Sequence, residues 1–407
     1  MNVFSLSWRY LWSRPLATGL NLLLLALGLA SMAFVLIARD QVDRAFERDL
    51  AGIDVVGGAK GSPMQLILAG VFHLDVPPGN IPLAEVQRLA QHPQVAQLIP
   101  LSLGDNLLGF RIVGTTPEYA SHYEAQLAQG ALWSRPMQAV LGAQVASRTG
   151  LLPGQAFEGA HGLGAGGTAH GETPYTVSGV LAPCGCVLDR LVLTATESVW
   201  QVHDDMHAGE DMDEAERLEL ADALAEEREV TMALITYNTP LAAVSFPRFI
   251  NSTTSMQAAA PALEITRLLS MVGVGTQVLR AMAAVLLVVA GLSVFIALWS
   301  AVRERRGDLA MLRMLGAPPA RVAALLLCEA LWLAALACAL GLLAAHALTA
   351  LMGEMLMARH SLAITGWQWV PGEAWVPLLA LGVAVAAALL PAITAYRVDV
   401  SQLLHAR

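Results

Sequence analysis

The chain has 407 residues, of which 56% are hydrophobic and only 14% are charged, and its formal net charge is −9. This composition excludes an ordinary soluble protein, in which about 25% of the residues are charged. The length allows two or three domains, and the acidic balance argues against nucleic-acid binding.

Four segments are long and apolar enough to cross a membrane as helices. Each contains one charged residue or none, and they comprise residues 15–38, 281–302, 322–353 and 374–396. A helix of about 22 residues rises roughly 33 Å, which exceeds the ~30 Å hydrocarbon core of a bilayer. The first segment is longer than the apolar core of a signal peptide, and no small-residue cleavage motif follows it, so we expect it to be retained.

The arginines predict how these helices are oriented. One, Arg359, lies in the loop between the third and fourth segments, whereas nine lie in short segments on the other side: Arg9, Arg14, Arg303, Arg305, Arg306, Arg313, Arg321, Arg397 and Arg407. Because short loops rich in arginine stay in the cytoplasm, we place both termini there. The chain then divides into residues 1–38, an extracytoplasmic domain of residues 39–267, and residues 268–407.

The extracytoplasmic segment has the pattern of a mixed α/β domain. It carries 13 basic and 27 acidic side chains, and it is long enough to bury its own core. Leu83, Val86 and Leu89 are spaced for one face of a helix, and residues 107–116 and 175–183 are typical of strands. Residues 139–157 indicate a strand, a short helix and a turn. We therefore predict four transmembrane α-helices with a large mixed α/β extracytoplasmic domain inserted between helices 1 and 2.

No sequence pattern indicates a catalytic centre or a nucleotide site, because the spacings of a P-loop, a zinc protease and a nucleophile elbow do not occur. His203 and His207 lie four residues apart in the acidic stretch 203–230, so they are candidate metal ligands on one helix face. We favour a solvated acidic stretch over a metal site, and a metal or envelope sensor remains an alternative.

Cys184 and Cys186 are separated by a single glycine. A bond between them would close a very small ring, so we expect free thiols or intermolecular pairing instead of a mutual disulfide.

The basic stretch between the second and third apolar segments has helical spacing. Its apolar residues Val302, Leu309, Leu312 and Leu315 recur at helical intervals, Gly316 follows as a C-terminal cap, and two prolines come next. These features predict a short amphipathic helix within residues 303–316. Glu329 lies eight residues into the third segment, within reach of an arginine of this stretch, and we expect it to form a structural ion pair there.

The same stretch resembles the segment V-x-E-R-x-x-E-I-G-x-L-R-A-L-G-A-x-x-x-x-V of the FtsX/MacB/LolC-type ABC transporter permeases. The matching residues are Val302, Glu304, Arg305, Leu312, Arg313, Leu315, Gly316, Ala317 and Val322, with Asp308 and Leu309 as conservative replacements. The C-terminal residues Pro391, Ala392 and Ala395 and the outer sequences "VLGAQVASRTGLLPGQAF" and "YTVSGVLAP" are similar to other motifs of this family.

The resemblance implies a non-catalytic permease in a bacterial cytoplasmic (inner) membrane, working with a separate cytoplasmic ATPase that binds ATP and Mg²⁺. No cofactor is expected in this chain. The helix would dock on the ATPase through Glu304, Arg305, Asp308, Leu309, Leu312, Arg313 and Gly316. Further implied partners are a second copy or a paralogue and a periplasmic adaptor or lipoprotein. Export or lipid and lipoprotein handling is the implied role, and an FtsX-like regulator of an extracytoplasmic partner is the alternative.

Overall fold

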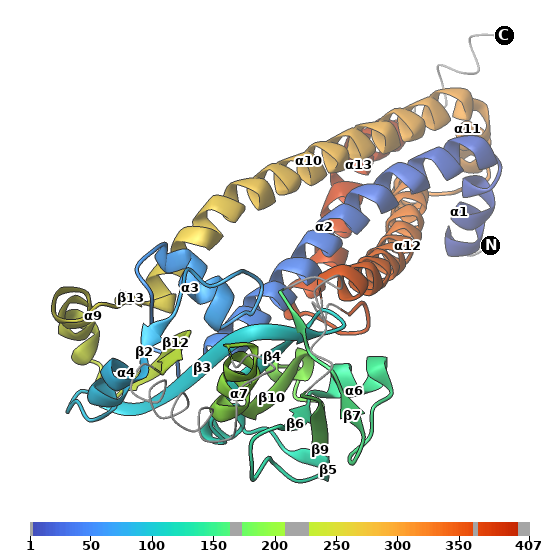
Figure 1. Cartoon of the computed structure of the whole chain (residues 1–407). Helices are drawn as coiled ribbons and strands as arrows, with labels where there is room; N and C mark the ends of the chain where they lie inside the picture. The colour runs from blue at the N-terminus through green and yellow to red at the C-terminus, as the bar shows by residue number, and fades with distance from the viewer. Residues whose placement is uncertain (1–2, 163–172, 208–227, 361–364, 398–407) are drawn as a thin grey trace, which may run out of the picture. The chain divides into compact units, whose positions relative to one another are not determined.

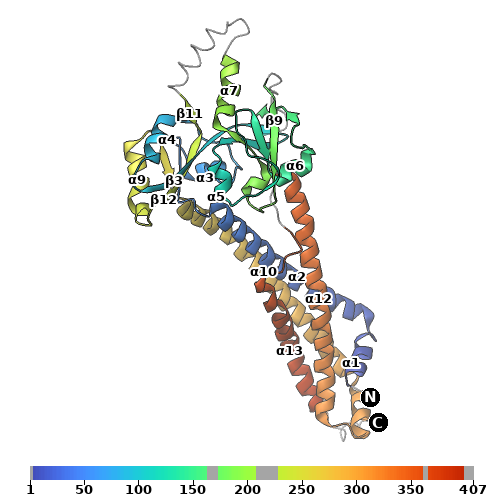
Figure 2. The same cartoon turned by 90° about the horizontal axis from the view of Figure 1, so that it is seen from below.

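The computed structural model describes residues 3–162, 173–207, 228–360 and 365–397. The chain divides into two compact units, shown in Figure 1 and, turned by 90°, in Figure 2. The helical unit comprises Met1–Asp43 and Met271–Arg407, and the sheet-containing unit comprises Arg44–Ser270.

Long helices and two short ones make up the described part of the first unit. They are α1 (Val3–Leu11), α2 (Pro15–Leu50), α10 (Pro261–Glu304), α11 (Arg306–Met314), α12 (Pro319–His360) and α13 (Trp375–Tyr396), with a 3₁₀ turn at Pro371–Ala374. Four segments among the described residues are long and apolar enough to span a membrane: Pro15–Leu50, Gln277–Glu304, Pro319–Met355 and Pro371–Tyr396. The predicted four-helix arrangement is confirmed.

Small residues let these helices approach closely. A Cβ added at Gly341 of α12 would lie 2.9 Å from the carbonyl oxygen of Ala26 and 3.0 Å from the Cβ of Leu29, both on α2. Buried alanines on α2, α12, α10 and α13 extend this packing, among them Ala33, Ala337, Ala290, Ala384 and Ala388. Close backbone approach of this kind favours helix association in a membrane, where the hydrophobic effect does not drive it.

A polar cluster ties α12 to the segment that leads into α13. The Nδ1 atom of His346 donates to the carbonyl of Gly366 at 2.6 Å, and its Nε2 lies 2.9 Å from Oε2 of Glu373, which is fully buried. Gln41 of α2 exchanges two hydrogen bonds with the backbone of Thr365, at 2.6 and 2.8 Å. These contacts fix the polar backbone between α12 and α13.

A large mixed sheet forms the second unit. Its main strands follow the order β13 (Gln257–Ala259), β1 (Val55–Gly58), β12 (Met232–Tyr237), β3 (Val95–Leu107), β4 (Phe110–Thr115), β10 (Leu191–Ala195), β6 (Gln138–Leu141), β9 (Tyr175–Leu181) and β5 (Leu127–Gly130). The short strands β7 (Ala156–Phe157) and β8 (Ala160–His161) pair with β9 and β3, and β2 (Ile81–Pro82) pairs with β11 (Glu229–Val230). Parallel and antiparallel pairs both occur, since β4 and β10 are parallel whereas β3 and β4 are antiparallel.

Short helices accompany the sheet: α3 (Pro63–Gly70), α4 (Leu83–Ala90), α5 (Glu118–His122), α6 (Ala143–Thr149), α7 (Thr196–His207) and α9 (Ala242–Thr253), with a 3₁₀ turn at Val187–Arg190. The helix expected from Leu83 onward is α4, and its Val86 and Leu89 are buried as the spacing requires. The expected strands are β4 and β9, and residues 139–157 contain β6, α6 and the left-handed Gly150. The predicted mixed α/β domain is confirmed.

The expectation for Cys184 and Cys186 is wrong, because these two residues form a disulfide. Gly185 between them has a φ of +64°, a conformation that costs glycine little. This turn places the two Cα atoms 5.1 Å apart, within the usual range of about 4.4–6.8 Å for a disulfide. A small ring is accessible here because the intervening residue is glycine.

Buried cations hold the segment that follows α3. Arg111 donates to the carbonyls of Ala69 and Asp75 at 3.3 and 2.8 Å, and Arg190 donates to the carbonyl of Phe72 at 2.8 Å. Burial lowers the pKa of Arg111 to about 10. His73 lies in the same segment, with Nε2 3.0 Å from the hydroxyl of Tyr119. Its pKa lies well below the usual range, because burial and then the nearby guanidinium groups of Arg111 and Arg190 disfavour its protonated form.

Candidate functional site

The short helix α11 is separated from α10 by a single non-helical residue, Arg305. Helix α10 ends at Glu304, Arg305 occupies the N-cap position with φ −96° and ψ 16°, and α11 runs over Arg306–Met314. The predicted amphipathic helix is therefore present as a separate element, shorter than residues 303–316. Figure 1 places α1 and α11 at the same end of the helical unit.

The C-terminal end of α11 is a glycine cap. Gly316 has a φ of +91°, its N–H donates to the carbonyl of Arg313 at 3.0 Å, and the N–H of Ala317 donates to the carbonyl of Leu312 at 3.0 Å. This pair of bonds is the Schellman motif, which satisfies the last carbonyls of a helix. The next helix, α12, starts at Pro319, because proline suits a first helical position that has no partner for its N–H.

Arg305 holds the start of α11 against two other helices. Its Nη1 lies 3.2 Å from Oε1 of Glu329 on α12, and only 14% and 5% of the two side chains are exposed. Its Nη2 donates to the hydroxyl of Ser13 at 2.7 Å and to the carbonyl of Tyr10 at 3.2 Å, and its guanidinium lies 4.4 Å from the centroid of the Tyr10 ring. The ion pair expected for Glu329 is present, and Arg305 is its partner.

Two further contacts fix α11 within the helical unit. Leu309 is buried in the core formed by α1, α2, α10, α12 and α13. Glu304, the last residue of α10, forms an ion pair with Arg14, which precedes α2. The inward face of α11 and the residues before it therefore hold the helix in place.

The opposite face of α11 is exposed and largely apolar. The exposed fractions of Met311, Met314 and Leu315 are 56%, 57% and 80%, and Asp308 is exposed beside them. At about 100° per residue these four positions lie on the side away from Leu309. We call Asp308, Met311, Met314 and Leu315 the outward face of α11.

The residues that the sequence predicts to dock on the ATPase do not all lie on one face of α11. Asp308 lies on the outward face, Leu312 and Arg313 are half-buried, and Gly316 ends the helix, whereas Arg305 and Leu309 point into the bundle and Glu304 pairs with Arg14. The sequence-based selection did not include Met311 and Met314. Their exposure could have been predicted from the helical periodicity. If Leu309 faces the core, the residues two and five positions after it fall on the opposite side of the helix.

The histidines named as metal ligands cannot be placed in a site. His203 and His207 lie in α7, but their side chains are outside the described part of the structure, as is most of the acidic stretch 203–230. Within the described residues, no group of three or more His, Cys, Asp or Glu side chains could hold a metal ion.

Comparison with protein families identifies the chain. The family model for the MacB-like periplasmic core domain matches residues 18–240, which is more than half of the chain, and the model for the C-terminal part of FtsX-like permeases matches residues 280–400. The chain belongs to the FtsX/MacB family of ABC transporter permeases. The permease is thus a non-catalytic transmembrane subunit, and its sheet-containing unit is the periplasmic or extracellular domain.

Two solved structures are similar to the outer part of the permease. The periplasmic region of MacB from Actinobacillus actinomycetemcomitans is 11% identical with a TM-score of 0.34, and the match covers 54% of the permease and 95% of that chain. The extracellular domain of the noncanonic ABC-type transporter YknZ from Gram-positive bacteria is 11% identical with a TM-score of 0.30, covering 51% and 98%. These TM-scores are too low to support a statement on function. The comparison with curated proteins gave no match.

Proposed function

We propose that the permease couples ATP hydrolysis by a separate cytoplasmic ATPase to movement of its extracytoplasmic domain, for export or for lipid and lipoprotein handling. ATP and Mg²⁺ bind to the ATPase. The partner in the membrane is a second copy or a paralogue, and an adaptor or lipoprotein acts on the outer side.

The orientation belongs to this proposal. Arginines surround α1 and α11, and the positive-inside tendency places that end of the helical unit, with both termini, in the cytoplasm of a bacterial inner membrane. The outward face of α11 then meets the compartment in which ATP is available.

The observation that carries the proposal is the contrast between the two faces of α11. One face is fixed by Leu309 and by the Arg305–Glu329 pair, while Met311, Met314 and Leu315 remain exposed on the other. A rigidly held helix that displays apolar side chains is suited to transmit force from a docked partner, because exposed apolar groups gain free energy when a partner covers them.

The continuity of α10 supports transmission of this movement. Helix α10 runs without interruption from Pro261, in the outer unit, to Glu304, immediately before Arg305 and α11. A displacement of α11 therefore acts on one end of a helix whose other end belongs to the outer unit. The spans carry few ionisable groups, which favours mechanical coupling over a polar conduit through the bilayer.

The experiment is a pull-down of the ATPase on the tagged, full-length permease from the membranes of its own cell. We expect Met311→Glu together with Leu315→Glu to reduce the co-purified ATPase at least tenfold, because each change places a charge in an apolar contact. The readout is ATP hydrolysis per permease molecule in the eluate.

The matched control is Phe4→Glu, since Phe4 is 56% exposed, as Met311 is, and belongs to α1, which lies at the same end of the helical unit as α11 (Figure 1). This control should retain its ATPase. Unchanged co-purification with the double variant, or an equal loss with Phe4→Glu, would contradict docking through the outward face of α11.

A further inference from the structure

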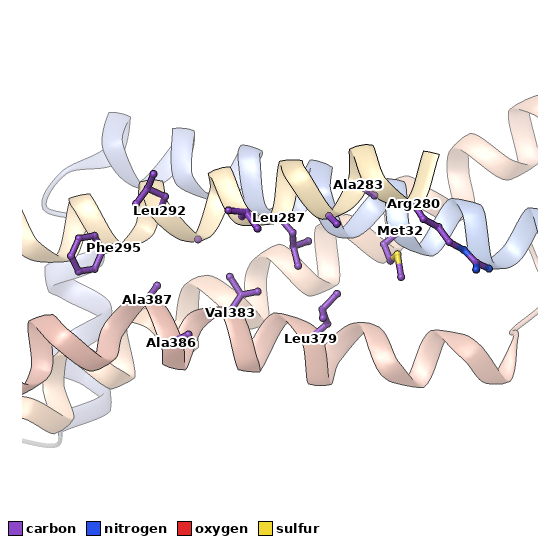
Figure 3. Close-up of a pocket in the computed structure, with 13 residues that line it drawn as sticks. Met32, Arg280, Ala283, Leu287, Leu292, Phe295, Leu379, Val383, Ala386 and Ala387 are labelled. Carbon is purple, nitrogen blue, oxygen red and sulfur yellow. The ribbon is translucent and has the colours of Figure 1, made fainter. Parts of the chain in front are cut away.

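A long apolar groove lies between α10 and α13, with α2 at its floor. Its volume is about 560 Å³, and Figure 3 shows side chains of α10 and α13 facing each other across it, with Met32 contributed by α2. Several of the lining residues are small, which keeps the groove open: Ala283, Ala284, Gly291, Ala386 and Ala387.

Arg280 is the one charged residue that lines this groove, and it lies at one end of it while Phe295 lies at the other. Its Nε atom is buried and has no hydrogen-bond partner, and no ion pair of Arg280 occurs within the described residues. An unpaired guanidinium at the edge of an apolar site favours an anion, above all a phosphate, because its planar fork can donate two hydrogen bonds at once.

The length of the groove fits one leaflet of a membrane. The 15 residues from Arg280 to Phe295 rise about 22 Å at ~1.5 Å per residue, and half of a bilayer of ~40–45 Å, headgroup regions included, is about 20–22 Å. Arg280 is ten residues from Ser270, the last residue of the outer unit, so the charged end of the groove belongs to the outer side.

We propose that this groove binds one phospholipid of the outer leaflet, with an acyl chain between α10 and α13 and the phosphate at Arg280. A phospholipid supplies both complements in one molecule, an apolar chain for the alanine-rich walls and an anion for the guanidinium. Burying the chain against the walls contributes about 0.8 kcal/mol per CH₂ in transfer from water, whereas transfer from bulk lipid gains little. Selectivity over bulk lipid therefore depends on Arg280.

The experiment is native mass spectrometry of the delipidated, full-length permease in detergent, titrated with palmitoyl-oleoyl phosphatidylglycerol. We expect one tightly bound lipid per chain, at least tenfold weaker binding for Arg280→Gln, and binding between these two for Arg280→Lys, because lysine keeps the charge but not the planar fork. Inorganic phosphate alone should show no saturable binding, which distinguishes a lipid headgroup from a free anion.

Two variants test the walls of the groove. Ala284→Phe and Ala386→Phe place a ring in the groove from exposed positions on α10 and α13, and each should weaken lipid binding at least tenfold. The control is Val289→Phe, an exposed position on the other side of α10 that does not line the groove, and it should bind as the wild type does.

Equal binding by Arg280→Gln and the wild type would overturn the proposal, as would equal losses with Val289→Phe. Disulfide cross-linking of two permease copies through Ala386→Cys in native membranes would also overturn it, because a second copy would then fill the groove. Co-purification of the ATPase is measured on the same variants. This site does not depend on ATPase docking, so a lipid result and a docking result can fail separately.

Discussion

The two units of the permease bury charge in different ways. In the described part of the helical unit, buried carboxylates lie beside basic side chains, Glu329 beside Arg305 and Glu373 beside His346. In the outer unit the buried guanidinium of Arg111 donates to backbone carbonyls at the end of α3 and in the segment after it. Arg190 combines both modes, since it donates to a carbonyl and lies 4.0 Å from a carboxylate oxygen of Asp49.

The difference follows from the surroundings of each unit. Inside a bilayer no water solvates an unpaired charge, so a buried carboxylate is retained where a counter-charge lies beside it. In a domain surrounded by water, the end of a helix and the segment after it, such as residues 69–75, have carbonyls that need donors, and an arginine can supply them. The stability of the helical unit should thus be most sensitive to the loss of one partner of an ion pair. The stability of the outer unit should be most sensitive to protonation of a neutral group near its buried arginines.

The largest effect is expected from Arg305→Ala. It leaves Glu329 buried without its counter-charge and removes the contacts to Tyr10 and Ser13, so the helical unit should lose about 3–5 kcal/mol. The measurement is the unfolding free energy in detergent, together with ATPase co-purification.

Arg303→Ala is the control, because Arg303 is exposed two residues away. The double variant Arg305→Met with Glu329→Leu removes both charges and should recover much of the loss. An effect of Arg305→Ala no larger than that of Arg303→Ala would show that the pair does not anchor α11.

A smaller effect is expected from pH in the outer unit. The folded state holds His73 neutral with a lowered pKa, whereas the unfolded chain binds a proton below about pH 6.5. Above that pH both states are neutral at His73 and its contribution does not change. As the pH falls below about 6.5, stability should fall by up to ~1.4 kcal/mol per pH unit. Hydrogen exchange of α3 between pH 7.5 and 5.5 would measure this.

His73→Gln should flatten the part of the pH dependence that arises from this residue. His122, whose pKa is also lowered by burial, contributes in the same direction and is exchanged for Gln in a second variant. A pH profile that His73→Gln leaves unchanged would argue against a neutral, buried His73.

The smallest effect is expected from Gly316→Ala, which involves no charge in either unit. A non-glycine residue at a φ of +91° costs about 1 kcal/mol, so the C-terminal turn of α11 should fray. Faster hydrogen exchange at the amides of residues 316 and 317 would report it. Gly307→Ala is the control, because Gly307 lies inside α11 with open space around it. This change should stabilise the helix by about 0.5–1 kcal/mol.

Much of the architecture could be predicted, because bilayer thickness imposes a length and a polarity on each span. The same holds for α4, β4 and β9, whose apolar spacing is a local property. The strand order could not be read from the sequence, since β3 pairs with β12 from more than a hundred residues away and hydrogen bonds between strands carry no sequence code.

The sequence by itself determined four spans, a short helix ended by Gly316, and the family motif around Arg305, because hydropathy, backbone conformation and spacing act over a few residues. Only the tertiary structure decided that Arg305 turns inward to Glu329, that Met311 and Leu315 face outward, and that Arg280 stands unpaired beside an apolar groove. It also decided that Cys184 and Cys186 join. The orientation of a side chain and its interaction partners depend on what packs against it. The neighbours of Arg305 and Arg280 come from residues that are distant in the sequence.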